Sequence, residues 1–328
     1  MSEIHKFLFQ GLPVRGVLVR LTDAWREILQ RRAANTVHGA YPPPLQNLLG
    51  EMTAAAVLMQ SNIKFDGSLV LQIFGDGPVK LAVVEVQPDL GLRATATVNG
   101  TVAADASLSQ MVDVGSGGRC AITLDPKTRQ PGQQPYQGVV PLHGDAQEPL
   151  EKFSDVLQHY MLKSEQLDTT LVLAADDQVA AGLLIQRLPI QGVGNLQGTA
   201  STNPDETADQ DEDYRRIAIL ASSLKREELL TLDVDTILRR LFWEEPLLRF
   251  EPLQGETGPR FSCSCSRERV SKMIAGLGAE EANSILQERP DIEVGCDFCG
   301  AQYRFDAVDV AQIFHQPGQL PPGTTAVH

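Results

Sequence analysis

Four of the chain's five cysteines lie close together near its carboxyl end, and this cluster limits the possible folds more than any other feature. Cys263 and Cys265 form a C-x-C pair, and after thirty further residues Cys296 and Cys299 form a C-x-x-C pair. In a reducing compartment, such clusters bind metals or act in catalysis more often than they form structural disulfides. Four-thiolate zinc sites commonly take two ligands from each of two short loops. The spacing therefore predicts one Zn²⁺ per chain, held by these four residues.

The compartment and the excluded partners follow from the rest of the composition. No stretch reaches the roughly 18 apolar residues that a membrane span needs. The first residues include Glu3, His5 and Lys6, which is wrong for a secretion signal. The formal net charge of −14 repels phosphate backbones and anionic lipid. We therefore expect a cytoplasmic protein that binds neither membranes nor nucleic acid.

Helix and strand signals come in groups rather than in strict alternation. Apolar residues at helical spacing predict helices over 22–36, 45–59 and 148–162. Short β runs bounded by turn residues predict strands over 68–74, 79–86, 92–98, 120–124, 137–142, 170–175 and 180–188. Elements grouped in this way predict an α+β fold, with a core domain of mostly antiparallel sheet and packed helices.

The composition changes after about residue 189. Residues 203–213 (NPDETADQDED) are strongly acidic and follow a Gly- and Gln-rich stretch, which predicts a flexible connection. Residues 214–250 are rich in Leu at helical spacing and need a partner surface. The chain is therefore expected to divide into four parts: a core domain (1–189), a flexible acidic segment with a Leu-rich helical linker (190–255), a small zinc-binding redox-switch domain (256–315) and a disordered tail (316–328).

The cysteine region predicts a domain of about 55 residues. Two helical segments lie between the cysteine pairs, and the C-D-F-C sequence is expected to form the tip of a hairpin, followed by a closing helix over 306–314. A domain this small is rarely stable without a cross-link such as a metal ion or a disulfide. Zinc binding contributes on the order of 10–16 kcal/mol in such sites, most of which would hold the fold together.

The spacing alone leaves several roles open for this site. It fits an inert structural knuckle, and it also fits a redox switch, because oxidants attack thiolates and a disulfide can no longer bind zinc. A zinc-ribbon nucleic-acid-associated protein would need basic residues near the metal, whereas residues 260–310 contain six Arg or Lys and nine Asp or Glu, a net of −3. A thiol–disulfide oxidoreductase would place C-x-x-C at a helix N-terminus.

Longer motifs add a resemblance. The segments FSCSCSRERV (261–270) and CDFCGAQYRF (296–305) are similar to the zinc domain of the heat-shock protein 33 family, which are redox-regulated holdase chaperones. FGDGPVKLAVVE (74–85), YQGVVPL (136–142), SEQLDTTLVLA (164–174) and AAGLLIQRLP (180–189) resemble core segments of that family in the same order. The resemblance covers nearly the whole chain and places Cys263, Cys265, Cys296 and Cys299 on the family's zinc ligands.

The resemblance implies a function as well as a site. It implies a non-enzymatic, ATP-independent chaperone of the stress response that binds unfolding client proteins under oxidative stress and heat, and that often forms a homodimer when active. It also implies that oxidation pairs Cys263 with Cys265 and Cys296 with Cys299 and releases zinc. The long acidic 191–213 segment and the extra thiol of Cys120 depart from the family pattern.

A mechanism consistent with this follows from the linker composition. In the reduced state we expect the Leu-rich segment 214–250 to pack on the amino-terminal sheet, held there by the folded zinc domain. Oxidation would unfold that domain and free apolar surface for clients. Cys120 opens an apolar run and is expected to be a buried core thiol.

Overall fold

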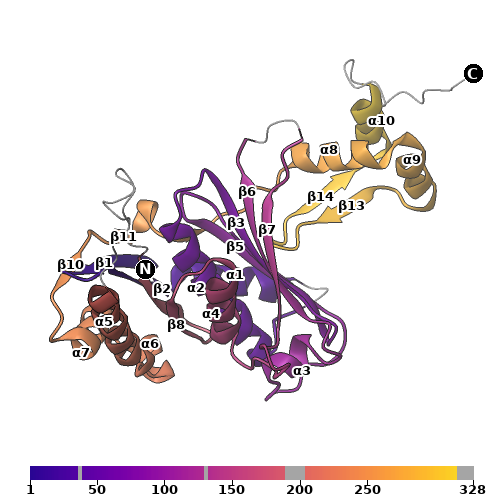
Figure 1. Cartoon of the computed structure of the whole chain (residues 1–328). Coiled ribbons are helices and arrows are strands. Elements are labelled where there is room, and N and C mark those ends of the chain that lie inside the picture. The colour runs from indigo at the N-terminus through magenta and orange to yellow at the C-terminus, as the bar shows by residue number, and fades with distance from the viewer. Residues whose placement is uncertain (36–38, 129–131, 189–203, 316–328) are drawn as a thin grey trace, which may run out of the picture. The chain divides into compact units, whose positions relative to one another are not determined.

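Figure 1 shows the computed structural model of the chain, which describes residues 1–35, 39–128, 132–188 and 204–315. Contacts between residues divide the chain into two units, Met1–Ser262 and Cys263–His328. Among the described residues, no helix combines the length and the apolar character that crossing a membrane requires.

The first sheet of the amino-terminal unit is antiparallel throughout. Its strands run in the order β10-β1-β2-β9-β8, and β11 also pairs with β1. The strands are β1 (Glu3–Phe9), β2 (Val14–Leu21), β8 (Thr169–Ala175), β9 (Ala180–Arg187), β10 (Leu247–Arg249) and β11 (Leu253–Gln254). The sequence analysis predicted β8 and β9 but neither β1 nor β2, which form the middle of this sheet together with β9.

The second sheet contains the five other predicted strands. They run in the order β12-β5-β4-β3-β6-β7, with every pair antiparallel except β12 and β5. The strands are β3 (Gly67–Phe74), β4 (Val79–Val86), β5 (Gly91–Val98), β6 (Arg119–Pro126), β7 (Tyr136–Pro141) and β12 (Arg260–Phe261). The predicted α+β class with mostly antiparallel sheet is therefore confirmed.

Helix α2 (Pro43–Asn62) is the centre of the main core. It packs against strands of both sheets, and its side chains from Leu45 to Gln60 are almost all buried. A helix that is apolar all round fits only such a site between two layers. The main core also includes residues from α1 (Asp23–Ala33), α3 (Leu108–Val112) and α4 (Phe153–Ser164). Cys120 is a fully buried member of it, as predicted.

A second apolar core lies on the other face of the first sheet. Helices α5 (Pro204–Ser222), α6 (Arg226–Thr231) and α7 (Val234–Phe242) gather beside this sheet in Figure 1. Apolar side chains along these helices, including Ile217, Leu229 and Leu241, are buried against the sheet. The expectation that the Leu-rich segment packs on the amino-terminal sheet is confirmed.

Two expectations for this region were wrong. Residues 204–213 of the acidic stretch belong to α5, so they are helical and do not form a flexible connection. Pro204 is the first residue of α5, a position where proline is favoured. The helical expectation for 214–250 fails after Phe242, because 247–249 extend to pair with β1. The expectations for 191–203 and for the tail over 316–328 fall outside the described residues.

The second unit is small. It contains α8 (Arg267–Leu277), α9 (Ala279–Glu288), the hairpin β13 (Ile292–Gly295) and β14 (Gln302–Phe305), and α10 (Ala307–His315). Its core consists of Val270, Ile274, Ala282, Ile292, Phe305 and Val310. Both predicted helices, the hairpin and the closing helix are present.

The second core of the first unit predicts a contrast between two adjacent residues. Phe242 is 2% exposed and its ring lies edge-on to Phe9 with centroids 5.0 Å apart, whereas Trp243 is 74% exposed. We expect Phe242→Ala to lower the free energy of unfolding of this unit by about 3–5 kcal/mol, because it leaves a cavity among aromatic rings. Trp243→Ala is the control and should cost less than about 0.5 kcal/mol. Denaturant unfolding checks both; equal effects would contradict the packing.

Candidate metal centre

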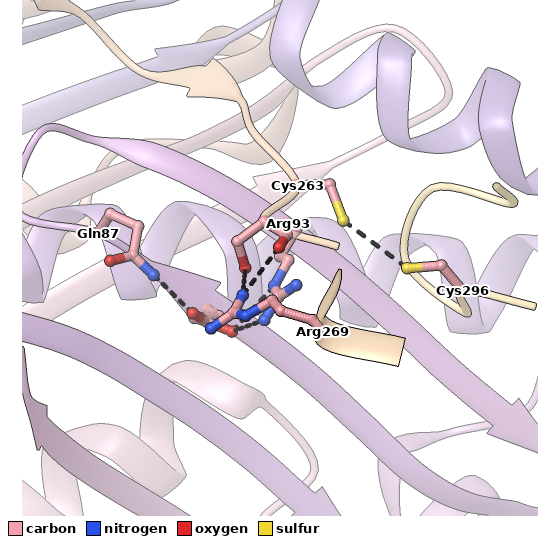
Figure 2. Close-up of polar contacts among 7 residues, drawn as sticks. Gln87, Arg93, Cys263, Arg269 and Cys296 are labelled. Atoms are coloured by element: carbon pink, nitrogen blue, oxygen red, sulfur yellow. Dashed lines mark hydrogen bonds and ion pairs between the residues drawn. The ribbon is translucent and has the colours of Figure 1, made fainter. Parts of the chain in front are cut away.

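The four clustered cysteines converge in the second unit. Their sulfur atoms all lie within 4.8 Å of one another. Among the described residues, they form the one group of three or more His, Cys, Asp or Glu side chains that lie close enough together to hold a metal ion. The Sγ atoms of Cys263 and Cys296 are 3.7 Å apart, and those of Cys265 and Cys299 are 3.2 Å apart. Figure 2 shows the sulfurs of Cys263 and Cys296 pointing toward each other.

Local structure explains how the two pairs meet. Cys296 and Cys299 occupy the turn of the β13–β14 hairpin, closed by a hydrogen bond from the Gly300 N–H to the Cys296 carbonyl (2.8 Å). Gly300 adopts a left-handed conformation (φ 73°), which glycine adopts readily. Cys263 and Cys265 precede α8, whose first turn is capped by the Ser266 hydroxyl. Each pair therefore sits where an ordered element begins or turns.

Arg269 stabilises the loop that carries the first pair. From the first turn of α8, its guanidinium donates a hydrogen bond to the carbonyl of Ser264 (2.9 Å) and another to the hydroxyl of the same residue. Ser264 lies between Cys263 and Cys265, so this contact fixes the backbone between two sulfurs. Figure 2 includes the Arg269 side chain.

Tyr303 is a second neighbour that the spacing of the cysteines did not reveal. Its hydroxyl donates a hydrogen bond to the Sγ atom of Cys265 (3.2 Å). Tyr303 lies on β14, and its register opposite Val294 places it on the hairpin that carries the second pair. Only the arrangement of the hairpin beside the C-x-C loop brings it to Cys265, so no local sequence signal could have identified it.

The metal-free cluster contains thiols of unequal acidity. Burial raises the pKa of Cys265, but the hydrogen bond from Tyr303 and the contacts with the other three cysteines outweigh burial and lower this pKa to about 7. Burial raises the pKa of Cys296 and of Cys299. Donation to Cys265 raises the pKa of Tyr303 to about 12, so the phenol stays protonated and keeps donating. Among Cys265, Cys296 and Cys299, Cys265 is therefore the thiol that ionises most readily.

The geometry fits a tetrahedral ion. Zinc–sulfur bonds of about 2.3 Å in a tetrahedron place sulfurs about 3.8 Å apart. The 3.7 Å separation of Cys263 and Cys296 matches this value, and all the others stay within 4.8 Å. Four sulfurs that hold a single ion in this way form a closed structural site. The cluster can therefore hold a metal ion.

The same distances do not select a disulfide pairing. The two short separations join one cysteine of each pair across the site, as expected around a shared ion, and none of the four residues forms a disulfide in the structure. Cys120, in contrast, is fully buried in the first unit, and burial raises its pKa to about 12. Cys120 lies far from the other four cysteines in the sequence, and its raised pKa keeps it protonated and unreactive at neutral pH.

Comparisons with known proteins agree along the chain. Residues 2–306 match the family model described as Hsp33 protein. The chain belongs to the Hsp33 family. The 33 kDa chaperonin of Chromobacterium violaceum is 44% identical over 313 residues, which cover 95% of this chain and 94% of that protein. The 33 kDa chaperonin of Methylobacillus flagellatus is 42% identical over 314 residues, with coverage of 95% and 94%.

A solved structure shows the same Hsp33 fold. The 33 kDa chaperonin of Thermotoga maritima superposes with a TM-score of 0.69 at 19% sequence identity, covering 95% of this chain and 98% of that one. The resemblance inferred from the cysteine motifs is therefore confirmed. Relatives named chaperonins support a chaperone function for this chain.

The acidity order predicts an order of alkylation in the reduced, metal-free protein. Because thiolates are the reactive form, Cys265 should react first with iodoacetamide at neutral pH, at a rate that rises as pH passes about 7. Tyr303→Phe removes the donor and should slow this reaction severalfold, whereas Tyr136→Phe, in the other unit, should leave it unchanged. Peptide mass spectrometry after brief labelling measures both. Faster labelling of Cys120 or Cys299 than of Cys265 would contradict the assignment.

Proposed function

We propose that this chain is a redox-regulated, ATP-independent holdase chaperone of the cytoplasm, without enzymatic activity, that binds unfolding proteins after its cysteines are oxidised. The observation that carries the proposal is the four-sulfur cluster in a domain whose own apolar core has few members. Membership of the Hsp33 family and relatives named 33 kDa chaperonin support it.

In the reduced state, we propose that Cys263, Cys265, Cys296 and Cys299 hold one Zn²⁺ per chain. When bound, the ion would keep the four sulfurs deprotonated and join the C-x-C loop to the hairpin turn. Arg269 holds the backbone of the first loop, and the Tyr303 hydroxyl donates to one sulfur. Hydrogen bonds of this kind around the ligands orient them for the metal.

Oxidation would then remove the ligands in pairs. For each pair, two thiolates, one peroxide molecule and two protons give one disulfide and two water molecules, so two peroxide molecules oxidise all four cysteines. We propose the pairs Cys263–Cys265 and Cys296–Cys299, each of which lies within one loop and needs little chain movement. The oxidised sulfurs can no longer bind the ion, and the domain loses the free energy of metal binding.

Unfolding of the zinc domain would affect the helical linker through the segment of chain that joins the two. Between α7 and Cys263, the regular structure consists of three short strands, β10, β11 and β12, of two or three residues each, and a 3-10 helix over Gly255–Thr257. Short edge strands have few hydrogen bonds and fray easily. We propose that their release frees α5–α7, so that the apolar face of the first sheet and the inner faces of these helices become available to clients.

Specific polar contacts hold the linker in its closed position. Arg20 on β2 donates to the carbonyls of Leu229 (3.0 Å), Leu230 (2.7 Å) and Leu232 (3.1 Å) at the carboxyl end of α6. A cation at a helix carboxyl end also complements the helix dipole. The linker is thus fixed to the first sheet by a separable set of contacts, which suits a reversible cover.

The four-part division of the chain and the partners complete the proposal. We propose a core domain over 1–189, a linker over 190–255, a zinc-binding redox-switch domain over 256–315 and a tail over 316–328. The partners would be unfolded or partly folded client proteins and, after oxidation, a second copy of the chain, but neither nucleic acid nor membranes. The freed apolar surface would account for both kinds of association.

The redox proposal predicts linked changes in metal and thiols. The reduced protein should contain one zinc and five free thiols, and peroxide at raised temperature should release the zinc and leave one thiol, Cys120. The same treatment should let the protein suppress light scattering from a thermally unfolding reporter enzyme without ATP. Cys120→Ser is the control and should behave alike with four thiols before and none after. Unchanged zinc content with undiminished scattering would refute the proposal.

The contacts between Arg20 and the linker predict a variant that is activated under milder conditions than the wild type. Arg20→Ala leaves three carbonyls at the end of α6 without their donor, and each lost hydrogen bond to a charged group costs about 1.5–3 kcal/mol. Suppression of aggregation should therefore begin at lower oxidant or temperature than in the wild type. Arg26→Ala serves as the control, because it removes an exposed cation whose ion pair, with Asp23, lies within α1. Equal activation of both variants would show that Arg20 does not hold the linker.

A further inference from the structure

The first unit contains an apolar cavity that the proposed function does not use. It lies beside the carboxyl end of α2, between strands of the two sheets and the end of α4, and its volume is about 120 Å³. Most of its lining is apolar and includes Met59, Leu69, Ile122, Leu124, Met161 and Leu184. An engineered apolar cavity of about 150 Å³ binds benzene, so this one suits a single ring or a branched aliphatic group.

The cavity is open to solvent on one side. Ile63 and Tyr136 also line it, and they are 36% and 52% exposed. Apolar side chains of this size are usually buried, and here they border an opening. A ligand can therefore enter without unfolding the core.

One wall carries positive charge without a neutralising carboxylate. Arg15 lines the cavity, and Lys6 lies near it on the adjacent strand, where the β1–β2 register pairs Lys6 with Val17 and Leu8 with Arg15. Both cations donate to carbonyls at the end of α2, Lys6 to Ser61 and Arg15 to Asn62, and Arg15 also donates to Gln186. Within the described part of the chain, neither forms an ion pair with Asp or Glu.

The electrostatics of these two cations support the same interpretation. Burial lowers the pKa of Lys6, the nearby Arg15 charge lowers it further, and burial lowers the pKa of Arg15. Two like charges that are half-buried together destabilise each other unless an anion joins them. This wall therefore favours an anionic group.

An unused donor lies in the same place. The side-chain amide nitrogen of Asn62, another lining residue, is buried and has no hydrogen-bond partner among the described residues. Buried donors are nearly always satisfied, so an unsatisfied one beside a cavity indicates an absent acceptor. Together with Arg15, it provides two kinds of donor at one end of an apolar space.

The lining of the cavity also includes a carboxylate, on a different segment of the chain from Arg15. Glu165 accepts hydrogen bonds from the hydroxyls of Tyr160 (2.5 Å) and Tyr136 (3.1 Å). Its negative charge would repel an anion near it and favour Arg15 as the contact for the charged end of a ligand. The cavity thus distinguishes one end of a ligand from the other.

We propose that this cavity is a binding site for a small apolar carboxylate, with its ring or branched chain among the apolar side chains and its carboxylate bonded to Arg15 and the Asn62 amide. Such a group could be a free aromatic or branched-chain acid, or the last residue of a polypeptide. This site stands apart from the redox proposal, because none of its residues belongs to the metal centre or the linker.

The test uses the full-length, reduced, zinc-loaded chain. Titration with 3-phenylpropionate, followed by nuclear magnetic resonance, should give saturable binding with a dissociation constant of about a millimolar or tighter. The matched neutral amide should bind about tenfold more weakly, because it lacks the charge-assisted hydrogen bonds. A short peptide that ends in Phe, with a free or an amidated carboxyl end, tells the two sources apart: equal binding of the free peptide and the small acid indicates a chain end, and binding of the small acid alone indicates a free acid.

Three variants separate the proposed role from a purely structural one. Arg15→Gln should weaken binding of 3-phenylpropionate about tenfold, whereas Arg119→Gln removes an equal charge from an exposed site and should leave it unchanged. Glu165→Gln keeps an acceptor for both tyrosines and should tighten binding severalfold, which a loss of stability would not produce. Absence of saturable binding, equal binding of acid and amide, or weaker binding by Glu165→Gln would each overturn the proposal.

Discussion

The four sulfur atoms of the second unit are the contact on which the account depends. Six buried side chains hold three helices and a hairpin there, which is a small core for that number of elements. The cysteines bring the C-x-C loop and the hairpin turn together, although Cys263 and Cys296, for example, are 33 residues apart in the sequence. An ion shared by these sulfurs would supply the stability that apolar burial does not.

The first unit contains two cores that differ in how separable they are. The core around α2 is enclosed by both sheets, so no part of it can be exposed without dismantling the unit. The core under α5–α7 has the sheet on one side and three helices on the other, and hydrogen bonds from Arg20 to carbonyls fix one of those helices. In the proposed function, these helices would leave the sheet while the sheet itself stays folded, and oxidation at the cysteines would thereby expose a large apolar surface.

Sequence patterns predicted what depends on neighbours along the chain. The cysteine spacing identified the residues that meet in the second unit, and short β runs bounded by turn residues identified β3 to β9. Contacts between distant segments were not predictable in this way: the pairing of β10 with β1, the hydrogen bond from Tyr303 to Cys265 and the cap that Arg20 places on α6 all join residues far apart in sequence. The acidic part of α5 was missed because its composition resembles that of a disordered segment.

Amide hydrogen exchange on the full-length protein, with and without oxidation, would show whether α5–α7 leave the first sheet when the second unit unfolds. We expect oxidation to remove protection first from α8–α10 and the β13–β14 hairpin and then from α5–α7, while β3 to β6 and α2 keep theirs. Chelation of the metal under reducing conditions should have the same effect on the second unit. Full protection of α5–α7 in oxidised protein that suppresses aggregation would contradict the account.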